Sequence, residues 1–210
     1  MTKRLIEMVC TANNGRSPVA ELVAQNYLKK VRADKDYQAI SSGTMVKAFA
    51  DGGFPIDKMV PMIDLAKNLE LYGPNDLETL NTAIDDGDQA TVESYFNQGS
   101  SAMCDEETES RDKLLLRHHI GSVKEKGEQT IARPDTVAVL TMDNRNYDRV
   151  GKIYVGYDNK PILSVVSILA GGELGSQIED AFGLGEEAYE RAFDQIINEV
   201  PRAIQKIVGA

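Results

Sequence analysis

The sequence predicts a three-layer α/β fold in which helices cover both faces of a central parallel sheet of about four strands. Two observations predict it. The first 41 residues run in the order strand, loop, helix, strand, and two further strand-like segments and a closing amphipathic segment occupy the second half of the chain. A strand that is followed by a helix and a parallel strand is the repeating unit of such sheets, because each helix packs back onto one face.

Each strand is predicted from a short run of apolar residues between polar or glycine-containing turns. The predicted strands cover residues 4–10, 37–41, 136–142 and 161–168. The third is the clearest, because it reads TVAVLTM.

Helices are predicted where apolar residues recur at intervals of three or four. Ser17 is a candidate for the cap of a helix that is expected to continue to about residue 31, with Pro18 in its first turn. The other predicted helices cover residues 56–71, 76–96 with a break at Gly87, 105–123, 143–150 and 185–208. Residues 42–55 and 97–103 are predicted to be loops, because they are rich in Gly, Pro or Ser.

Length and composition indicate one globular domain over residues 1–210, with enough apolar residues for a buried core. A net charge of −10 argues against binding to nucleic acid or to an anionic membrane, since both attract positive charge. Two cysteines cannot form a disulfide framework, and we find neither a secretion signal nor a membrane-spanning run. We therefore expect a cytoplasmic protein.

The acidic residues are concentrated in one window. Residues 76–112 contain eleven acidic residues and one basic residue, so this window accounts for the whole net charge and the rest of the chain is balanced.

The loop after the first strand has the spacing of an oxyanion site. Cys10 ends the strand, five residues follow, and Arg16 and Ser17 begin the helix. Such a loop can turn its N–H groups inward and hold a tetrahedral oxyanion together with the helix N-terminus. Arg16 can bind two oxygens of that anion, Cys10 can act as a thiolate nucleophile, and Ser17 can donate to its sulfur. Asn13 tolerates the left-handed backbone that such a loop needs. The alternative is a structural cysteine before an ordinary turn.

These residues lie in a segment, 9–21 (VCTANNGRSPVAE), that resembles the signature of the low-molecular-weight protein tyrosine phosphatases. Three later segments resemble that family in the same order: 41–44 (SSGT), 139–146 (VLTMDNRN) and 178–183 (IEDAFG), the last of which corresponds to the family's acid loop. The resemblance covers residues 1–72 and 134–210 and implies the phosphatase I-like form of the α/β fold.

The resemblance implies a cysteine-dependent phosphomonoesterase that works through a cysteinyl-phosphate intermediate. Its catalytic residues would be Cys10 as nucleophile, Arg16 and Ser17 as stabilising groups, and Asp180 as general acid. The residues expected to bind the substrate are Thr11, Ala12, Asn13, Asn14, Gly15 and Phe182. No metal and no cofactor is implied, and the expected substrate is a phosphate ester such as a phosphotyrosine protein. The competing interpretation of Asp180 is an acidic residue that favours the start of the last helix.

Four positions depart from the family pattern. In the loop, Ala12 replaces a glycine, and Gly15 stands where eukaryotic members have a second cysteine. In the acid segment, Ala181 replaces the proline after the acid, and Phe182 stands alone where members often have two aromatic residues. These differences bear on loop flexibility and on the preference for aryl phosphates. The candidates for an opposite aromatic wall are Phe49 and Phe54.

Residues 73–133 exceed what the family pattern requires. We predict that they form an inserted acidic subdomain or lid of about three helices. Its charge indicates either solvated helix faces or a docking surface for a protein partner.

Two alternative functions remain. An arsenate reductase with an external thiol would use the same oxyanion loop, and Cys104 is a spare cysteine in the insertion. A phosphate-binding regulatory module with little catalytic activity would be consistent with Ala12 and Ala181.

Overall fold

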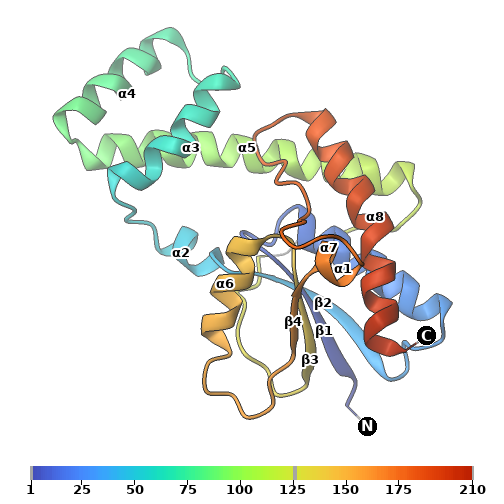
Figure 1. The fold of residues 1–210 in the computed structure, drawn as a ribbon. Coiled ribbons are helices and arrows are strands. Elements are labelled where there is room, and N and C mark those ends of the chain that lie inside the picture. The colour runs from blue at the N-terminus through green and yellow to red at the C-terminus, as the bar shows by residue number, and fades with distance from the viewer. Residues whose placement is uncertain (1, 125–126, 210) are drawn as a thin grey trace.

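The sheet is the centre of the fold, and its four strands are parallel. The computed structural model describes residues 2–124 and 127–209. The strands β1 (Arg4–Cys10), β2 (Tyr37–Gly43), β3 (Thr136–Thr141) and β4 (Ile162–Val165) lie in the order β2-β1-β3-β4 (Figure 1). Cys10 pairs with Gly43, so both lie at the carboxyl edge of the sheet. In open α/β sheets this is the edge at which ligands bind.

Helices cover both faces of the sheet, which confirms the predicted three-layer arrangement. α1 (Arg16–Lys30) and α8 (Glu186–Val208) pack together on one face, over a core that includes Met8 and Leu140. α6 (Asn144–Ile153) covers the opposite face, over a core that includes Val9. Because successive side chains of a strand point to opposite faces, the neighbours Met8 and Val9 belong to different cores.

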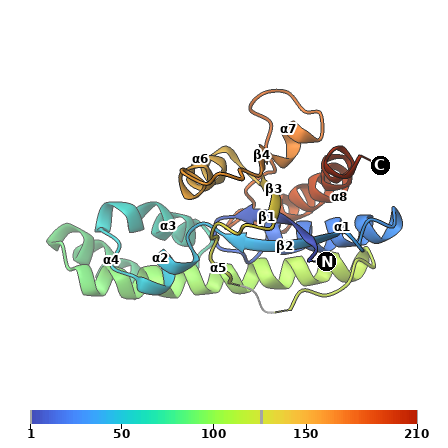
Figure 2. The ribbon, with the colours of Figure 1, turned by 90° about the horizontal axis from the view of Figure 1, so that it is seen from below.

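Four helices lie between β2 and β3 and extend the molecule to one side. They are α2 (Val46–Asp51), α3 (Ile56–Asn68), α4 (Pro74–Asp86) and α5 (Gln89–Arg117). We call residues 56–103 the arm, because they share a core of their own that includes Met59, Ile63, Leu80, Val92 and Met103. Figures 1 and 2 show the arm projecting from the sheet, while the far end of α5 lies beside α8. Among the described residues, none of the helices is long and apolar enough to cross a membrane.

Several predicted boundaries are confirmed and others are wrong. The break at Gly87 is confirmed, because Gly87 adopts a left-handed φ of 71° and ends α4. The predicted loop over 42–55 is wrong, since β2 continues to Gly43 and residues 46–51 form α2. The predicted helix over 105–123 ends at Arg117, because His119 is left-handed. The predicted strand over 161–168 is also too long, because residues 166–169 turn into the short helix α7 (Val166–Leu169).

The predicted loop over 97–103 is wrong, because these residues lie in the middle of α5, a continuous helix of 29 residues. The small residues that suggested a turn instead make room for packing. A Cβ at Gly99 would overlap the hydroxyl of Tyr72 and lie 2.8 Å from the Cβ of Ala66. Tertiary packing of α5 on α3 therefore overrides local propensity. The described residues of the range 73–133, which are 73–124 and 127–133, consequently contain two helices and not about three.

We predict that Gly99→Ala destabilises the protein, although alanine normally favours a helix interior over glycine by about 1 kcal/mol. The added methyl group would overlap Tyr72, so we expect the free energy of unfolding in urea to fall by about 1–3 kcal/mol. Gly151→Ala in α6 is the matched control, because the nearest atom to a Cβ there, Leu163 Cδ2, is 3.9 Å away. That control should gain about 0.5–1 kcal/mol. Equal gains at both positions would contradict the close packing.

Candidate active site

Cys10 lies beneath the loop of residues 11–15, which leads from β1 into α1. Its sulfur is buried and accepts two hydrogen bonds, from the backbone N–H of Asn13 (3.3 Å) and from the hydroxyl of Ser17 (3.0 Å). Asn13 has a left-handed φ of 56°, as expected from its residue type. Two donors that face one sulfur stabilise negative charge on it. The loop therefore holds Cys10 in an environment that suits a nucleophilic thiolate.

The end of β2 supports this loop through its backbone. A Cβ at Gly43 would lie 2.7 Å from the backbone of both Asn13 and Thr11. The next residue, Thr44, donates its N–H to the carbonyl oxygen of Cys10 at 3.0 Å. The glycine of the segment 41–44 (SSGT) is therefore required by packing, because any larger residue at position 43 would occupy the space that the loop fills.

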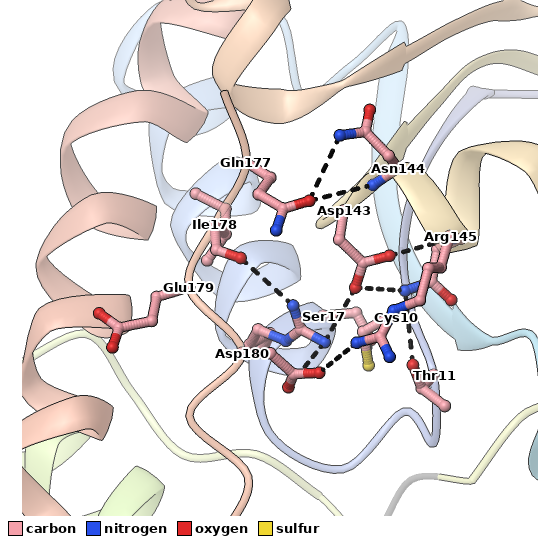
Figure 3. Close-up of polar contacts among 12 residues, drawn as sticks. Cys10, Thr11, Ser17, Asp143, Asn144, Arg145, Gln177, Ile178, Glu179 and Asp180 are labelled. Atoms are coloured by element: carbon pink, nitrogen blue, oxygen red, sulfur yellow. Dashed lines mark hydrogen bonds and ion pairs between the residues drawn. The ribbon is translucent and has the colours of Figure 1, made fainter. Parts of the chain in front are cut away.

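The side chain of Arg16 is buried beside the loop and is held by three acceptors. Its Nη2 lies 3.1 Å from Asp143 Oδ2 and 3.0 Å from Asp180 Oδ1, and its Nη1 donates to the carbonyl of Ile178 at 3.4 Å. In Figure 3, Asp143, Asp180 and the Ile178 carbonyl converge beside Cys10. Burial alone lowers the pKa of Arg16, but the charges of Asp180, Cys10 and Asp143 outweigh it and the pKa is raised. The guanidinium therefore remains a fixed positive charge.

Asp143 is positioned by the start of α6. As the N-cap residue, it accepts hydrogen bonds from the backbone N–H and the Nδ2 group of Asn146, both at 2.8 Å. Asn146 also accepts a hydrogen bond from the hydroxyl of Thr44 at 2.7 Å. Asp143 thus links the helix, the β2 end and Arg16 in one network.

Asp180 lies between two guanidinium groups. Its Oδ2 accepts a hydrogen bond from Arg145 at 2.9 Å, while its Oδ1 pairs with Arg16. The segment is anchored just before it, because the N–H of Ile178 donates to the carbonyl of Met142 at 2.9 Å. Ala181, which stands in place of a proline, is buried. Packing and this backbone bond therefore hold the acid segment near Arg16.

α5 contacts the loop through hydrogen bonds to Asn14. The side-chain amide of Asn14 donates to the Cys104 carbonyl (3.2 Å) and to Glu107 Oε2 (3.0 Å). Its side-chain oxygen accepts from the Thr108 hydroxyl at 3.2 Å, and its carbonyl accepts from Arg111 at 2.7 Å. Four residues of one helix thus fix one loop residue.

Glu107 packs directly on Gly15. A Cβ at Gly15 would overlap the carboxyl group of Glu107, so a cysteine at position 15 would require the Glu107 side chain to move. Burial raises the pKa of Glu107 to about 7, although the hydrogen bond from Asn14 and the charge of Arg16 oppose that shift. The departure from the family pattern at Gly15 therefore has a physical cause.

A pocket of about 480 Å³ opens over Cys10, a size that suits a small ligand or a single side chain. Its polar side consists of the loop and Arg16, together with Asp180, Arg145 and Arg149. The apolar side comes from α2, the arm and the acid segment, through Val46, Phe49, Met62, Phe96 and Phe182. α5 adds the polar residues Asn97, Ser100, Ser101, Cys104 and Glu107.

The structure brings the predicted site residues together in two groups. The residues that line the pocket are Cys10, Thr11, Ala12, Asn14, Gly15, Arg16, Asp180 and Phe182. Asn13 and Ser17 are fully buried and contact the sulfur of Cys10 instead. Of the two candidates for the opposite aromatic wall, Phe49 lines the pocket.

Sequence reasoning assigned no individual role to Asp143 or Arg145, and it placed Glu107 with Asp105, Glu106 and Glu109 on the acidic surface of the insertion. Asp143 follows the third strand directly, and the carboxyl ends of parallel strands share one edge, so this position did carry a signal. Glu107 carried none, since it stands among acidic residues that suggest a solvated helix face.

Comparisons with known proteins agree on the architecture. No profile of a known family matches the sequence, and no curated protein matches it. YfkJ from Bacillus subtilis matches with a TM-score of 0.62 at 15% identity, over 100% of this chain and 97% of that one. A low-molecular-weight protein tyrosine phosphatase from T. tengcongensis matches with a TM-score of 0.58 at 18% identity, over 97% and 99% of the two chains. The chain has the fold of the low-molecular-weight protein tyrosine phosphatases. DARP, a Drosophila arginine phosphatase, matches with a TM-score of 0.59 at 17% identity, over 97% of each chain.

We predict that Glu107→Gln stabilises the protein increasingly as the pH rises from 5 to 8. The pKa of Glu107 is raised from its ordinary 4.5 to about 7 in the folded state, so native Glu107 weakens folding progressively between those two values. The glutamine can keep the bond from Asn14 without the buried charge. The advantage in unfolding free energy should therefore grow by about 2 kcal/mol over this range, measured by urea titration. If the difference in unfolding free energy between Glu107→Gln and the wild type did not change with pH, the raised pKa of Glu107 would be refuted.

Proposed function

We propose that this protein is a cysteine-dependent phosphomonoesterase of the protein tyrosine phosphatase type. The observation that carries the proposal is the environment of Cys10, whose sulfur faces the N–H of Asn13 and the hydroxyl of Ser17 below a loop flanked by Arg16. An oxyanion in this loop would meet inward N–H groups and a buried guanidinium. The phosphatase fold is the expected setting for this chemistry and supports the proposal.

In the first step, the Cys10 thiolate attacks phosphorus and an S–P bond forms as the ester P–O bond breaks. Asp180 gives its proton to the leaving oxygen. Arg16 stabilises the equatorial phosphoryl oxygens, a role in which no metal is required. The incoming anion takes over the guanidinium, so it also replaces the Arg16–Asp180 ion pair of 3.0 Å.

In the second step, water attacks the cysteinyl-phosphate. Asp180, now a carboxylate, accepts a proton from that water, and the S–P bond breaks to regenerate the thiolate. Ser17 donates to the departing sulfur, as the hydrogen bond of 3.0 Å in this structure supports. Thr11, Ala12, Asn13, Asn14 and Gly15 serve as the oxyanion cradle.

The proposed substrate is a phosphate ester with an apolar group, such as the phosphotyrosine of a protein. Phe49 and Phe182 support this assignment, because they line the apolar side of the pocket that faces the loop. A cytoplasmic location is proposed with it, since Cys10 and Cys104 are free thiols and a nucleophilic cysteine must stay reduced.

Arsenate reduction is a second candidate, because Cys104 lines the same pocket as Cys10. Burial and the charges of Glu107 and Asp105 raise the pKa of Cys104 to about 11, so its thiol stays protonated near neutral pH and is a poor nucleophile. This argues for an external thiol in any such reaction. Thiol oxidation that requires arsenate and is lost in Cys104→Ser would favour an internal thiol and a reductase.

We also propose that residues 73–133 are an inserted lid, since α5 supplies part of the pocket wall. Three of its acidic residues, Asp105, Glu106 and Glu109, retain exposed surface and differ in this from the buried Glu107. They would repel polyanionic substrates within about 10 Å at 0.1 M salt and attract a basic partner protein.

The catalytic assignment predicts three levels of activity toward aryl phosphates at mildly acidic pH. Cys10→Ser should abolish turnover. Asp180→Asn should lower kcat for phosphotyrosine by about 10²–10⁴-fold, and less for p-nitrophenyl phosphate, whose leaving group needs little protonation. Glu179→Gln is the matched control, because Glu179 pairs with Arg191 at 2.8 Å and points away from Cys10 (Figure 3). Its kcat should change far less. Wild-type protein without turnover, or activity that survives Cys10→Ser, would disprove the mechanism.

The lid assignment predicts a different kinetic signature. Joint replacement of Asp105, Glu106 and Glu109 by their amides should raise kcat/KM for an acidic phosphopeptide at low salt, with little change in kcat. The gain should disappear as salt increases, because the charges are exposed. A change confined to kcat would show that these residues do not select the substrate.

A further inference from the structure

Glu107 is a buried acid in the pocket wall that no step of the proposed mechanism uses. Of the eleven acidic residues in 76–112, Glu107 is the buried one, with 7% of the residue's surface exposed. It lines the pocket together with Cys10 and Arg16. A buried carboxyl group beside a site for a dianion needs an explanation, because like charges repel strongly where water is excluded.

The contacts of Glu107 tie it to the backbone that would hold the anion. It accepts a hydrogen bond from Asn14 at 3.0 Å and fills the space above Gly15. The titratable or charged groups that face it are Arg16 on α1, Arg111 and Cys104 on α5, Asp180 in the acid segment and Tyr189 on α8. Any change in its charge is therefore felt by the loop, by Arg16 and by Asp180.

We infer that Glu107 is a positioning residue that fastens α5 to the phosphate loop and takes up one proton from solvent when a dianion binds there. The inference rests on the proposed function only in assuming that the loop and Arg16 bind an oxyanion. The step is a simple protonation, in which a carboxylate and a proton form a carboxylic acid and no other bond changes.

Electrostatics connects binding to this protonation. An ionised Glu107 opposes the incoming anion and competes with it for the positive charge of Arg16. The pKa of Glu107, raised to about 7 mainly by burial, means that the neutral form is available near neutral pH at little cost. A bound dianion adds negative charge nearby and favours the neutral form further. Anion affinity should therefore be high below pH 7 and fall as the pH rises past it.

Sulfate is the probe that isolates this effect, because it remains a dianion from pH 5.5 to 8.5 whereas phosphate itself titrates. The background is Cys10→Ser, which removes the nucleophilic thiol. We would measure sulfate affinity across this range by calorimetry in Cys10→Ser, in Cys10→Ser/Glu107→Gln and in Cys10→Ser/Asp105→Asn. Asp105→Asn is the matched control for the pH-dependence of sulfate affinity and not for its absolute value, since it removes an exposed carboxylate two residues away on the same helix.

In Cys10→Ser and in the Asp105→Asn control, we expect sulfate affinity to fall by about tenfold or more between pH 5.5 and 8.5. With Glu107→Gln, most of this fall should vanish. An equal fall in all three proteins would overturn the role of Glu107 while leaving the oxyanion site intact. No sulfate binding in any of them would overturn the oxyanion site as well, and with it the proposed function.

A second measurement needs no change at Glu107 and so does not depend on the folding of that variant. In Cys10→Ser/Asp180→Asn, sulfate binding at pH 7 is compared in buffers of different ionisation enthalpy, which reports proton uptake. We expect uptake of a substantial fraction of one proton. Binding without proton uptake would overturn the inference.

Discussion

The separate parts of the site depend on one buried cation, the guanidinium of Arg16. It is bound by Asp143 after β3 and by Asp180 before α8, two segments that are distant in sequence from α1. A buried charge is costly unless it is paired, so the fold is constrained to bring both carboxylates to the carboxyl edge of the sheet. In the proposed mechanism, the same guanidinium exchanges one carboxylate for a phosphoryl group.

α5 adds a second constraint to this shared fold. Its contacts with Asn14 and Gly15 restrict the movement of the loop, and they come from a helix that lies outside the sheet. A carboxyl group at Glu107 would be a poor choice for a loop that holds dianions if it were always ionised. Under the proposed function, the burial of Glu107 would resolve this conflict, because its neutral form would support the loop without opposing a bound dianion.

The elements that were predicted correctly are those that their own local sequence determines. The spacing from Cys10 to Arg16 and the run TVAVLTM needed no knowledge of the rest of the chain, and the sheet and the loop followed from them. In α5 the sequence-based prediction was wrong, because contacts with distant parts of the chain determine the structure there. The sequence around Gly99 is typical of a turn, but Gly99 lies in a helix because Tyr72 packs closely against it. The sequence around Glu107 is typical of an exposed helix face, but Glu107 is buried because α5 crosses the loop there. Neither contact leaves a periodic pattern in the local sequence.

The continuity of α5 also affects whether residues 73–133 can be removed or transplanted. One end of the helix lies in the core of the arm, and Leu114 and Leu115 near its other end are buried in the core shared by the sheet, α1 and α8. Excising residues 73–133 would therefore remove part of the main core along with the appendage. α5 is therefore a structural component of the domain, and a variant that lacks it would need other apolar side chains to complete the core of the sheet.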